Sequence, residues 1–224
     1  MGKVRAVCIS EKRGTQKKNI ESAVFVENWG IEGDAHAGNW HRQISLLSEE
    51  TIAAFKARGA EVTDGAFGEN LVVSGYDFTK FPVGTRFTCK DVVLELTQIG
   101  KECHHGCEIF QKMGECIMPT NGVFAKVLHG GKISVGDEFH VQYRAAVITL
   151  SDTASKGERE DASGAAAEEI VGKEGYEVVF KKIIPDDGDT LTALLCELSD
   201  EDKADLILTT GGTGFSQRDN TPEA

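Results

Sequence analysis

The pattern of apolar runs changes near Gln142-Tyr143-Arg144, and this change restricts the chain to two different folding patterns. After this point, uninterrupted apolar runs alternate with segments of helical spacing. The expected elements are a strand at Ala145–Leu150, a helix at Ala162–Lys173, a strand at Val178–Ile184, a helix at Thr190–Leu198 with Asp189 as its N-cap, and a strand at Leu206–Thr210. Strands and helices that alternate in this way predict a parallel sheet covered by helices on both faces.

Before this point, short β-type runs are separated by glycine-containing turns. These runs are a first strand within residues 1–10, then Ala23–Glu27, Gln43–Leu47, Glu69–Ser74, Arg86–Cys89, Val92–Gln98 and Glu138–Gln142. A helix is expected over Ser48–Arg58, because Ser48 is a favourable N-cap and acidic residues follow it. Many short strands with few helices predict a mostly β, barrel-like domain over residues 1–143, followed by an α/β domain over residues 144–224.

The charge of the chain limits its partners. The net charge is −12, and residues 144–224 carry most of it, with 8 Lys and Arg against 18 Asp and Glu. Such a surface argues against nonspecific nucleic-acid binding, which needs a basic footprint. No apolar run is long enough to span a bilayer, and six cysteines without an export signal are expected to be reduced thiols. A cytoplasmic protein with no membrane or nucleic-acid partner is the expectation.

Three polar clusters follow the three predicted strands of the second half. They are Ser151-Asp152, Pro185-Asp186-Asp187 and the loop Gly211-Gly212-Thr213-Gly214. Each alone is more often structural than functional. Ligands of open parallel sheets bind where the strands end, and a glycine-rich loop beside carboxylates suits a phosphate with a divalent cation. The loop is not a P-loop, because no Gly-Lys-Ser/Thr follows it.

Reactive and metal-binding types of side chain are most concentrated, within the first half, in the segment Lys101-Glu102-Cys103-His104-His105-Gly106-Cys107-Glu108. Three interpretations stay open. The thiols can be ordinary small buried side chains, or Cys103, Cys107, Cys116 and a histidine can form a zinc site, for which the spacing is weak support. Alternatively, Cys103 is a reactive thiolate stabilised by Lys101 and the histidines, suited to molybdenum or to sulfane sulfur.

The second half resembles the molybdopterin adenylyltransferase (MogA/MoaB-like) family. The resemblance is carried by Ile148-Thr149-Leu150-Ser151-Asp152, Ile184-Pro185-Asp186-Asp187, Thr209-Thr210-Gly211-Gly212-Thr213-Gly214 and Arg218-Asp219-Asn220-Thr221-Pro222-Glu223-Ala224. It implies a three-layer α/β/α fold and transfer of AMP from Mg-ATP to molybdopterin with release of pyrophosphate. The family domain continues past the last motif, so the domain is expected to be C-terminally truncated and this chain to have doubtful activity.

The resemblance also implies roles for individual residues of the second half. Asp186 and Asp219 match the functional aspartates and are the catalytic candidates, with Asp186 also a magnesium ligand. The cofactor-binding candidates are Ser151, Asp152, Thr210, Gly211, Gly212, Thr213, Gly214, Arg218 and Thr221. Because the family forms trimers or hexamers, a homo-oligomer is expected.

The first half resembles the MOSC family, which is named for the C-terminus of molybdenum cofactor sulfurase. The matching pieces are Gly33-Asp34-x-His36-x-Gly38, Gly68-Glu69-Asn70-Leu71, Leu96-Thr97-Gln98-Ile99-Gly100-Lys101-Glu102-Cys103, and Gly122-Val123-Phe124-Ala125 through Gly136-Asp137. This resemblance implies a β-rich barrel and a functional Cys103 that binds molybdenum or carries sulfur. It makes Asp34, His36, Glu69, Asn70 and Lys101 cofactor-binding candidates, and pyridoxal phosphate binding a further expectation.

Together, the two resemblances predict a protein of molybdenum cofactor biosynthesis or handling. Molybdopterin or the molybdenum cofactor and Mg-ATP are its expected ligands, and other proteins of the same biosynthesis are its expected partners. Two alternatives stay open. The chain can be a non-catalytic carrier of the cofactor, or its MOSC half can reduce N-hydroxylated compounds.

Overall fold

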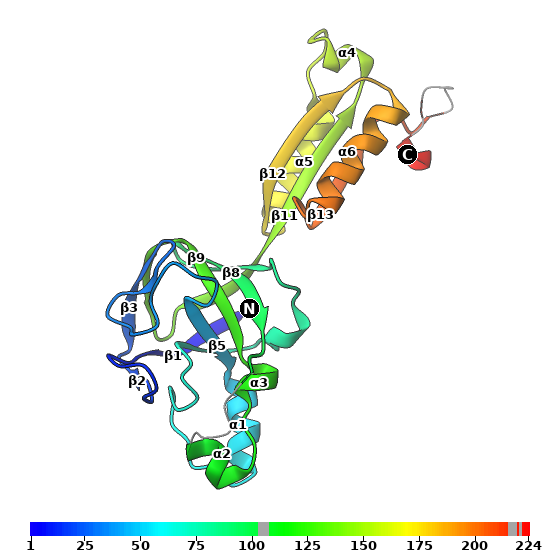
Figure 1. Ribbon diagram of the computed structural model, residues 1–224. Helices are drawn as coiled ribbons and strands as arrows, with labels where there is room; N and C mark the ends of the chain where they lie inside the picture. Colours follow the sequence, from blue (N-terminus) through cyan, green and yellow to red (C-terminus); the bar gives the residue numbers. More distant parts are fainter. Residues whose placement is uncertain (103–107, 215–218, 220) are drawn as a thin grey trace. The chain divides into compact units, whose positions relative to one another are not determined.

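The computed structural model describes residues 1–102, 108–214, 219 and 221–224 (Figure 1). Its internal contacts divide the chain into two compact units, Met1–Val141 and Gln142–Ala224. No helix within the described ranges combines the length and the apolar character needed to cross a membrane.

The first unit is built on a mixed sheet in which most neighbours are antiparallel. Its strands are β1 (Gly2–Ile9), β2 (Lys18–Asn19), β5 (Ile44–Ser48), β6 (Leu71–Ser74), β7 (Arg86–Cys89), β8 (Val92–Ile99), β9 (Val123–His129) and the start of β11 (Glu138–Leu150). The pairing order is β11-β7-β8-β9-β5-β6-β1, and β1 also pairs with β11. The path of paired strands therefore returns to the strand on which it began.

Within the described residues of this unit there are also a second, three-stranded sheet and four short helices. The sheet has the order β10 (Gly131–Ser134), β3 (Ser22–Val26) and β4 (Gly30–Ile31). The helices are α1 (Glu49–Ala57), η1 (Phe78–Lys80), α2 (Glu108–Met113) and α3 (Met118–Asn121). The expectation for α1 is confirmed, because the Ser48 hydroxyl accepts a hydrogen bond from the Thr51 N–H at 3.0 Å.

Two apolar clusters fill the first unit. The larger one contains the buried rings of Phe25, Phe78, Phe87 and Phe139, and the Phe87 and Phe139 rings stack with their centroids 5.4 Å apart. The second lies under α1, which buries Ile52 and Phe55. Side chains alternate across the pleat of β1 and β8, so these strands bury one face in a core and expose part of the other.

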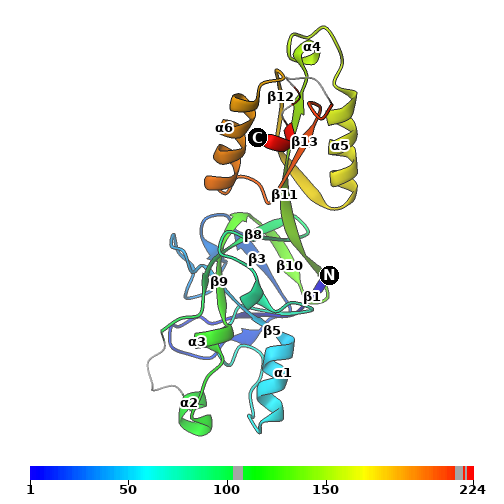
Figure 2. The same ribbon diagram turned by 90° about the vertical axis from the view of Figure 1, so that its right-hand side faces the viewer.

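The second unit contains a parallel sheet with the remainder of β11 at its centre. β12 (Tyr176–Ile184) and β13 (Leu206–Thr210) pair with it on its two sides. Helices α5 (Ala162–Lys173) and α6 (Gly188–Asp200) lie on opposite sides of this sheet in Figure 2. The remaining elements are α4 (Asp152–Ser155) and η2 (Thr221–Glu223). The predicted parallel sheet is confirmed, and the bounds of α5 and β13 agree with the sequence expectation.

Two sequence expectations are wrong in detail. The runs at Glu138–Gln142 and Ala145–Leu150 are one strand, β11, although a break was expected between them. At this point the Arg144 N–H donates to Asp205 Oδ2 at 2.7 Å, and its guanidinium donates to Asp205 Oδ1 at 2.9 Å. The N-cap of α6 is Asp187 and not Asp189, since Asp187 Oδ2 accepts the Thr190 N–H at 3.0 Å.

We expect Asp187→Ala to destabilise the second unit by about 1 kcal/mol, because the first turn of α6 loses its side-chain acceptor. Asp189→Ala is the matched control and should cost only a few tenths of a kcal/mol, since Asp189 acts on the helix dipole alone. Urea unfolding followed by circular dichroism at 222 nm reports α5 and α6. Both tryptophans, Trp29 and Trp40, belong to the first unit, so the fluorescence transition should stay unchanged. Equal effects of the two variants would contradict the assignment of the cap.

Candidate functional site

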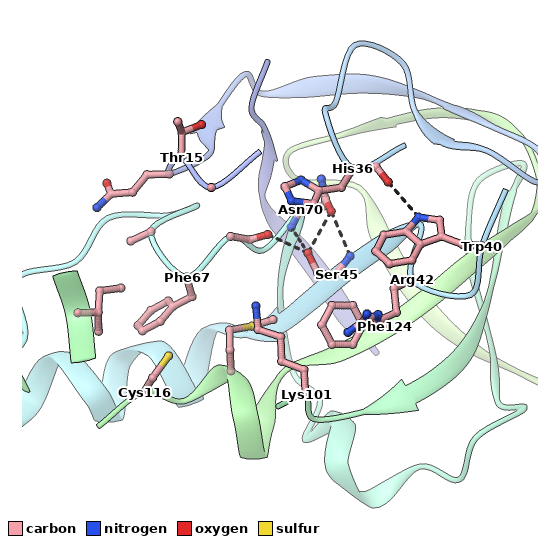
Figure 3. A pocket seen from close by; sticks show the side chains of 16 residues that line it. Thr15, His36, Trp40, Arg42, Ser45, Phe67, Asn70, Lys101, Cys116 and Phe124 are labelled. Atoms are coloured by element: carbon pink, nitrogen blue, oxygen red, sulfur yellow. Dashed lines mark hydrogen bonds between the residues drawn. The ribbon is translucent and has the colours of Figure 1, made fainter. Parts of the chain in front are cut away.

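The first unit contains a pocket of about 830 Å³ (Figure 3). Loops and strands from distant parts of the sequence contribute its lining. The lining residues are Gly14, Thr15, Gln16, His36, Trp40, Arg42, Ser45, Ala66, Phe67, Gly68, Asn70, Lys101, Ile109, Cys116, Met118 and Phe124. Three of the predicted residues, His36, Asn70 and Lys101, therefore share one cavity.

Basic side chains line part of this pocket. The Arg42 guanidinium carbon lies 5.0 Å from the centre of the Trp40 ring and 5.5 Å from that of Phe124 (Figure 3). Such cation–π contacts hold a guanidinium in place without using its hydrogen-bond donors. Among the described residues, the buried Nε of Arg42 has no hydrogen-bond partner. Arg42 and Lys101 therefore give the lining positive charge that suits an anionic group, and the His36 imidazole lies in the same lining.

Asp34 lies behind the pocket lining, where it forms a buried ion pair that sequence reasoning missed. Lys17 Nζ lies 2.5 Å from Asp34 Oδ1, and both side chains are almost wholly inaccessible to solvent. Asp34 also accepts the N–H of Ser10 at 2.9 Å and that of His36 at 3.2 Å. Asp34 thus connects the end of β1 to the loop that carries His36.

Glu69 and Asn70 organise the loop beside the pocket. The buried carboxylate of Glu69 accepts the N–H of Gly65 at 2.6 Å and that of Phe67 at 3.0 Å, while burial raises its pKa to about 7. Asn70 Oδ1 accepts the N–H of Ser45 at 3.1 Å, and its amide donates to the carbonyl oxygen of Cys8 at 3.0 Å. Both side chains therefore shape the site through the backbone. Their predicted contacts with a cofactor stay predictions.

The second unit brings together the polar residues that follow β11 and β12. The Asp152 N–H donates to Asp186 Oδ2 at 3.0 Å, and the Asp186 N–H donates to Asp152 Oδ1 at 3.2 Å. Ser151 accepts the Ala154 N–H at 3.2 Å and so begins α4. This reciprocal pair holds the two carboxylates next to each other at one edge of the sheet.

The glycine loop after β13 is tied to the residues that follow it. Thr221 donates its N–H to the carbonyl oxygen of Gly212 at 3.1 Å and its hydroxyl to that of Gly211 at 2.9 Å. Gly211 has a φ of +88°, and a Cβ there would collide with the carbonyl oxygen of Leu150. A Cβ at Gly214 would lie 2.6 Å from Asp219 Oδ2, which places that carboxylate beside the loop. Thr210 is the last residue of β13, and Thr213 lies within the loop.

Two predicted site residues, Cys103 and Arg218, lie outside the described residues. The described part of the chain contains no group of three or more His, Cys, Asp or Glu side chains that could hold a metal ion. The magnesium role of Asp186 and the molybdenum role of Cys103 both stay predictions.

Sequence reasoning missed Lys17, Trp40, Arg42 and Phe124. An arginine two positions after a tryptophan, just beyond the motif Gly33–Gly38, was a usable signal for Arg42. Lys17 had no comparable signal, because its partner Asp34 is 17 positions away in the sequence and no regular spacing connects them.

We expect Gly211→Ala to destabilise the second unit by more than about 1 kcal/mol, because the new Cβ meets the Leu150 carbonyl and the backbone is left-handed. Gly172→Ala is the matched control. It lies in α5 with open space around it, so it should stabilise the unit by up to about 1 kcal/mol. Urea unfolding at 222 nm measures both. A neutral Gly211→Ala would show that the loop adopts another conformation in solution.

Comparisons with protein families match the two halves separately. The model of the family described as "MOSC domain" matches residues 33–140, and that of the family described as "Probable molybdopterin binding domain" matches residues 146–224. The chain therefore combines a MOSC domain with part of a domain of the molybdopterin-binding MoaB/MogA type.

Individual relatives agree with the second match. The molybdopterin adenylyltransferase of Pyrococcus furiosus is 45% identical over 82 residues, which cover 37% of this chain and 47% of that protein. The enzyme of the same name from Escherichia coli is 39% identical over 84 residues, covering 36% and 43%. The chain thus spans about half the length of the curated relatives that it matches.

Among solved structures, the YUAD protein of Bacillus subtilis matches with a TM-score of 0.55. The match covers 63% of this chain and 96% of that protein at 22% sequence identity. At this identity the likeness concerns the fold alone.

Proposed function

We propose that this chain is a protein of molybdenum cofactor biosynthesis or handling whose first unit binds the molybdenum cofactor. The observation that carries the proposal is the guanidinium of Arg42, which lies in the pocket lining with Lys101 and whose buried Nε, within the described residues, has no partner. A phosphate on a pterin ligand is the kind of group that a guanidinium and an ammonium group in one pocket lining bind. The MOSC match over residues 33–140 supports the same ligand class.

The residues of the pocket fit such a ligand. Arg42 and Lys101 would hold the anionic group, and His36 would donate a hydrogen bond to it. Trp40 and Phe124 supply flat apolar surface next to the guanidinium. When bound, the cofactor would supply a molybdenum centre, for which the Cys103 thiolate is the proposed ligand or sulfur carrier. In this proposal the protein binds, orients and shields the ligand.

For the second unit we propose participation in transfer of AMP from Mg-ATP to molybdopterin. The relatives named molybdopterin adenylyltransferase support this activity. Asp186 and Asp152 would hold the magnesium ion, which commonly uses one or two carboxylates together with substrate phosphates. The backbone of Gly211–Gly214 would bind phosphate, Ser151, Thr210, Thr213 and Thr221 would line the site, and Arg218 and Asp219 would act beside it. The ion would neutralise charge on the phosphates.

The finer architecture belongs to the same proposal. The closed pairing path through β11, β7 and β1 supports a barrel in the first unit. The positions of α5 and α6 on opposite sides of the sheet support a three-layer second unit. A homo-oligomer, other cofactor-biosynthesis proteins as partners and pyridoxal phosphate binding are further expectations from the resemblances.

We expect the wild-type chain, purified from a molybdenum-replete host, to retain molybdenum and a fluorescent pterin. Cys103→Ser should lose both. Arg42→Gln should lower the affinity for the cofactor about 10- to 100-fold, because a hydrogen bond to a charged group contributes about 1.5–3 kcal/mol. Elemental analysis and pterin fluorescence provide the measurement.

Cys196→Ser is the control for the thiol, since Cys196 is exposed on α6 in the second unit. Absence of molybdenum from the wild type would contradict cofactor retention by the first unit. Loss of the metal in Cys107→Ser with retention in Cys103→Ser would show that Cys107 is the ligand, and zinc in the wild type would favour a zinc site.

Mg-ATP should raise the melting temperature of the second unit, because a ligand that binds only the folded state stabilises it. The magnesium-dependent part of the shift should be smaller in Asp186→Asn than in Asp189→Asn, which leaves the strand ends unchanged. Thermal unfolding is followed at 222 nm with and without EDTA. No shift with Mg-ATP in the wild type would favour the non-catalytic carrier.

A further inference from the structure

A network of three polar side chains lies behind the pocket and consists of Lys17, Asp34 and His36. The side chains of Lys17 and Asp34 are 1% and 0% exposed, whereas that of His36 is 34% exposed and lines the pocket. Lys17 Nζ lies 2.5 Å from Asp34 Oδ1 and 3.3 Å from His36 Nδ1. These contacts therefore connect the fully buried carboxylate of Asp34 to the partly accessible imidazole of His36.

Lys17 and Asp34 each favour the charged form of the other. Burial by itself would raise the pKa of Asp34, but hydrogen bonds from Lys17 and the Ser10 N–H hold it below its usual value. Burial lowers the pKa of Lys17, and the hydrogen bond and charge of Asp34 oppose this effect. A carboxylate and an ammonium group 2.5 Å apart in a dry environment are the stable pair, because either charge alone would be uncompensated.

A charged Lys17 restricts the protonation of His36. An ammonium group has three donors and no acceptor, so the ring nitrogen 3.3 Å away accepts the hydrogen bond. Nδ1 therefore has a lone pair, and the single proton of the neutral ring is on Nε2. Asp34 does not reverse this assignment, because its Oδ2 lies 3.8 Å from Nδ1 and accepts the backbone N–H of His36.

The other charges near His36 also favour the neutral ring. Burial contributes most to the lowered pKa of His36, the positive charge of Lys17 is next, and Asp34 opposes both. Arg13 and Lys101 lower the pKa further. Arg13 donates to the carbonyl oxygen of Ala35 at 3.0 Å, on the loop that carries His36. Among the residues that the structure describes, three cations thus lower the pKa of His36, and one carboxylate raises it.

We propose that Lys17 is a positioning residue that fixes His36 as a neutral Nε2–H donor toward the pocket. The ligand group that this donor recognises is an acceptor oxygen, such as that of a phosphate. This arrangement differs from a histidine that a neighbouring carboxylate keeps positively charged. Here the Lys17 ammonium contacts both Asp34 and His36, and its charge disfavours protonation of His36 Nδ1. The inference rests on the proposed function only in taking this pocket as the ligand site.

Nitrogen-15 NMR of the histidine rings in the full chain, without ligand, tests the tautomer. We expect His36 Nδ1 to have the shift of an unprotonated nitrogen and Nε2 that of a protonated one. The titration midpoint of His36 should lie below the ordinary value of about 6.5. His140, a partly exposed histidine beside Glu138, is the internal reference.

The informative variant is Lys17→Met combined with Asp34→Asn, which removes both buried charges together. The single Lys17→Met variant leaves an unpaired buried carboxylate and can fail to fold. In the double variant we expect the His36 midpoint to rise, Nδ1 to become partly protonated, and His140 to stay unchanged. A wild-type ring protonated on Nδ1, or a double variant with the wild-type tautomer and midpoint, would overturn the proposal.

Inorganic phosphate is the probe for the acceptor oxygen. It should move the Nε2 resonance of His36 in the wild type, and not that of His140. No movement of the His36 resonance at saturating phosphate would overturn the ligand assignment. Failure to retain molybdenum would contradict the proposed function but would leave the tautomer measurement unaffected, so the two failures are distinguishable.

Discussion

The buried ion pair between Lys17 and Asp34 is the interaction on which the architecture of the pocket depends. Removing two charges from water has a penalty of several kcal/mol per ion, so such a pair persists only where further hydrogen bonds complete it. Here the N–H groups of Ser10 and His36 complete the coordination of Asp34. The Lys17 backbone also donates to Gly65, whose own N–H is held by Glu69. One ion pair therefore connects the end of β1, the His36 loop and the loop before β6.

The second unit was largely predictable because its local patterns agree with its tertiary structure. The apolar run Ala145–Leu150, which forms the second part of β11, is buried throughout, as expected for the central strand of a parallel sheet. The errors occurred where neighbouring residues compete for one role. Asp187 and Asp189 are equally good caps in sequence, and only the backbone conformation at Asp187 decides between them. The single strand β11 includes Arg144, whose partner Asp205 is 61 positions away in the sequence.

For the candidate site, the sequence predicted which loops contain candidate residues, but not how the individual side chains are arranged. Of the residues in the sequence motifs, the structure places His36, Asn70 and Lys101 in the lining of one pocket. The motifs did not show that Asp34 and Glu69 act from behind its lining, because burial of a carboxylate depends on chain segments far away in sequence. The Arg42 guanidinium lies against the rings of Trp40 and of Phe124, which is 82 positions beyond it. No periodicity in the chain encodes that contact.

The single strand β11 has a practical consequence for dissection of the molecule. Residues at its beginning pair with β1, and residues from Tyr143 onward pair with β12. A boundary placed at Gln142 therefore cuts a hydrogen-bonded strand and leaves a frayed terminus on each fragment, with Arg144 close to the new start of one of them. If the two halves are expressed separately, each fragment should therefore include the whole of residues 138–150, so that both contain the complete strand.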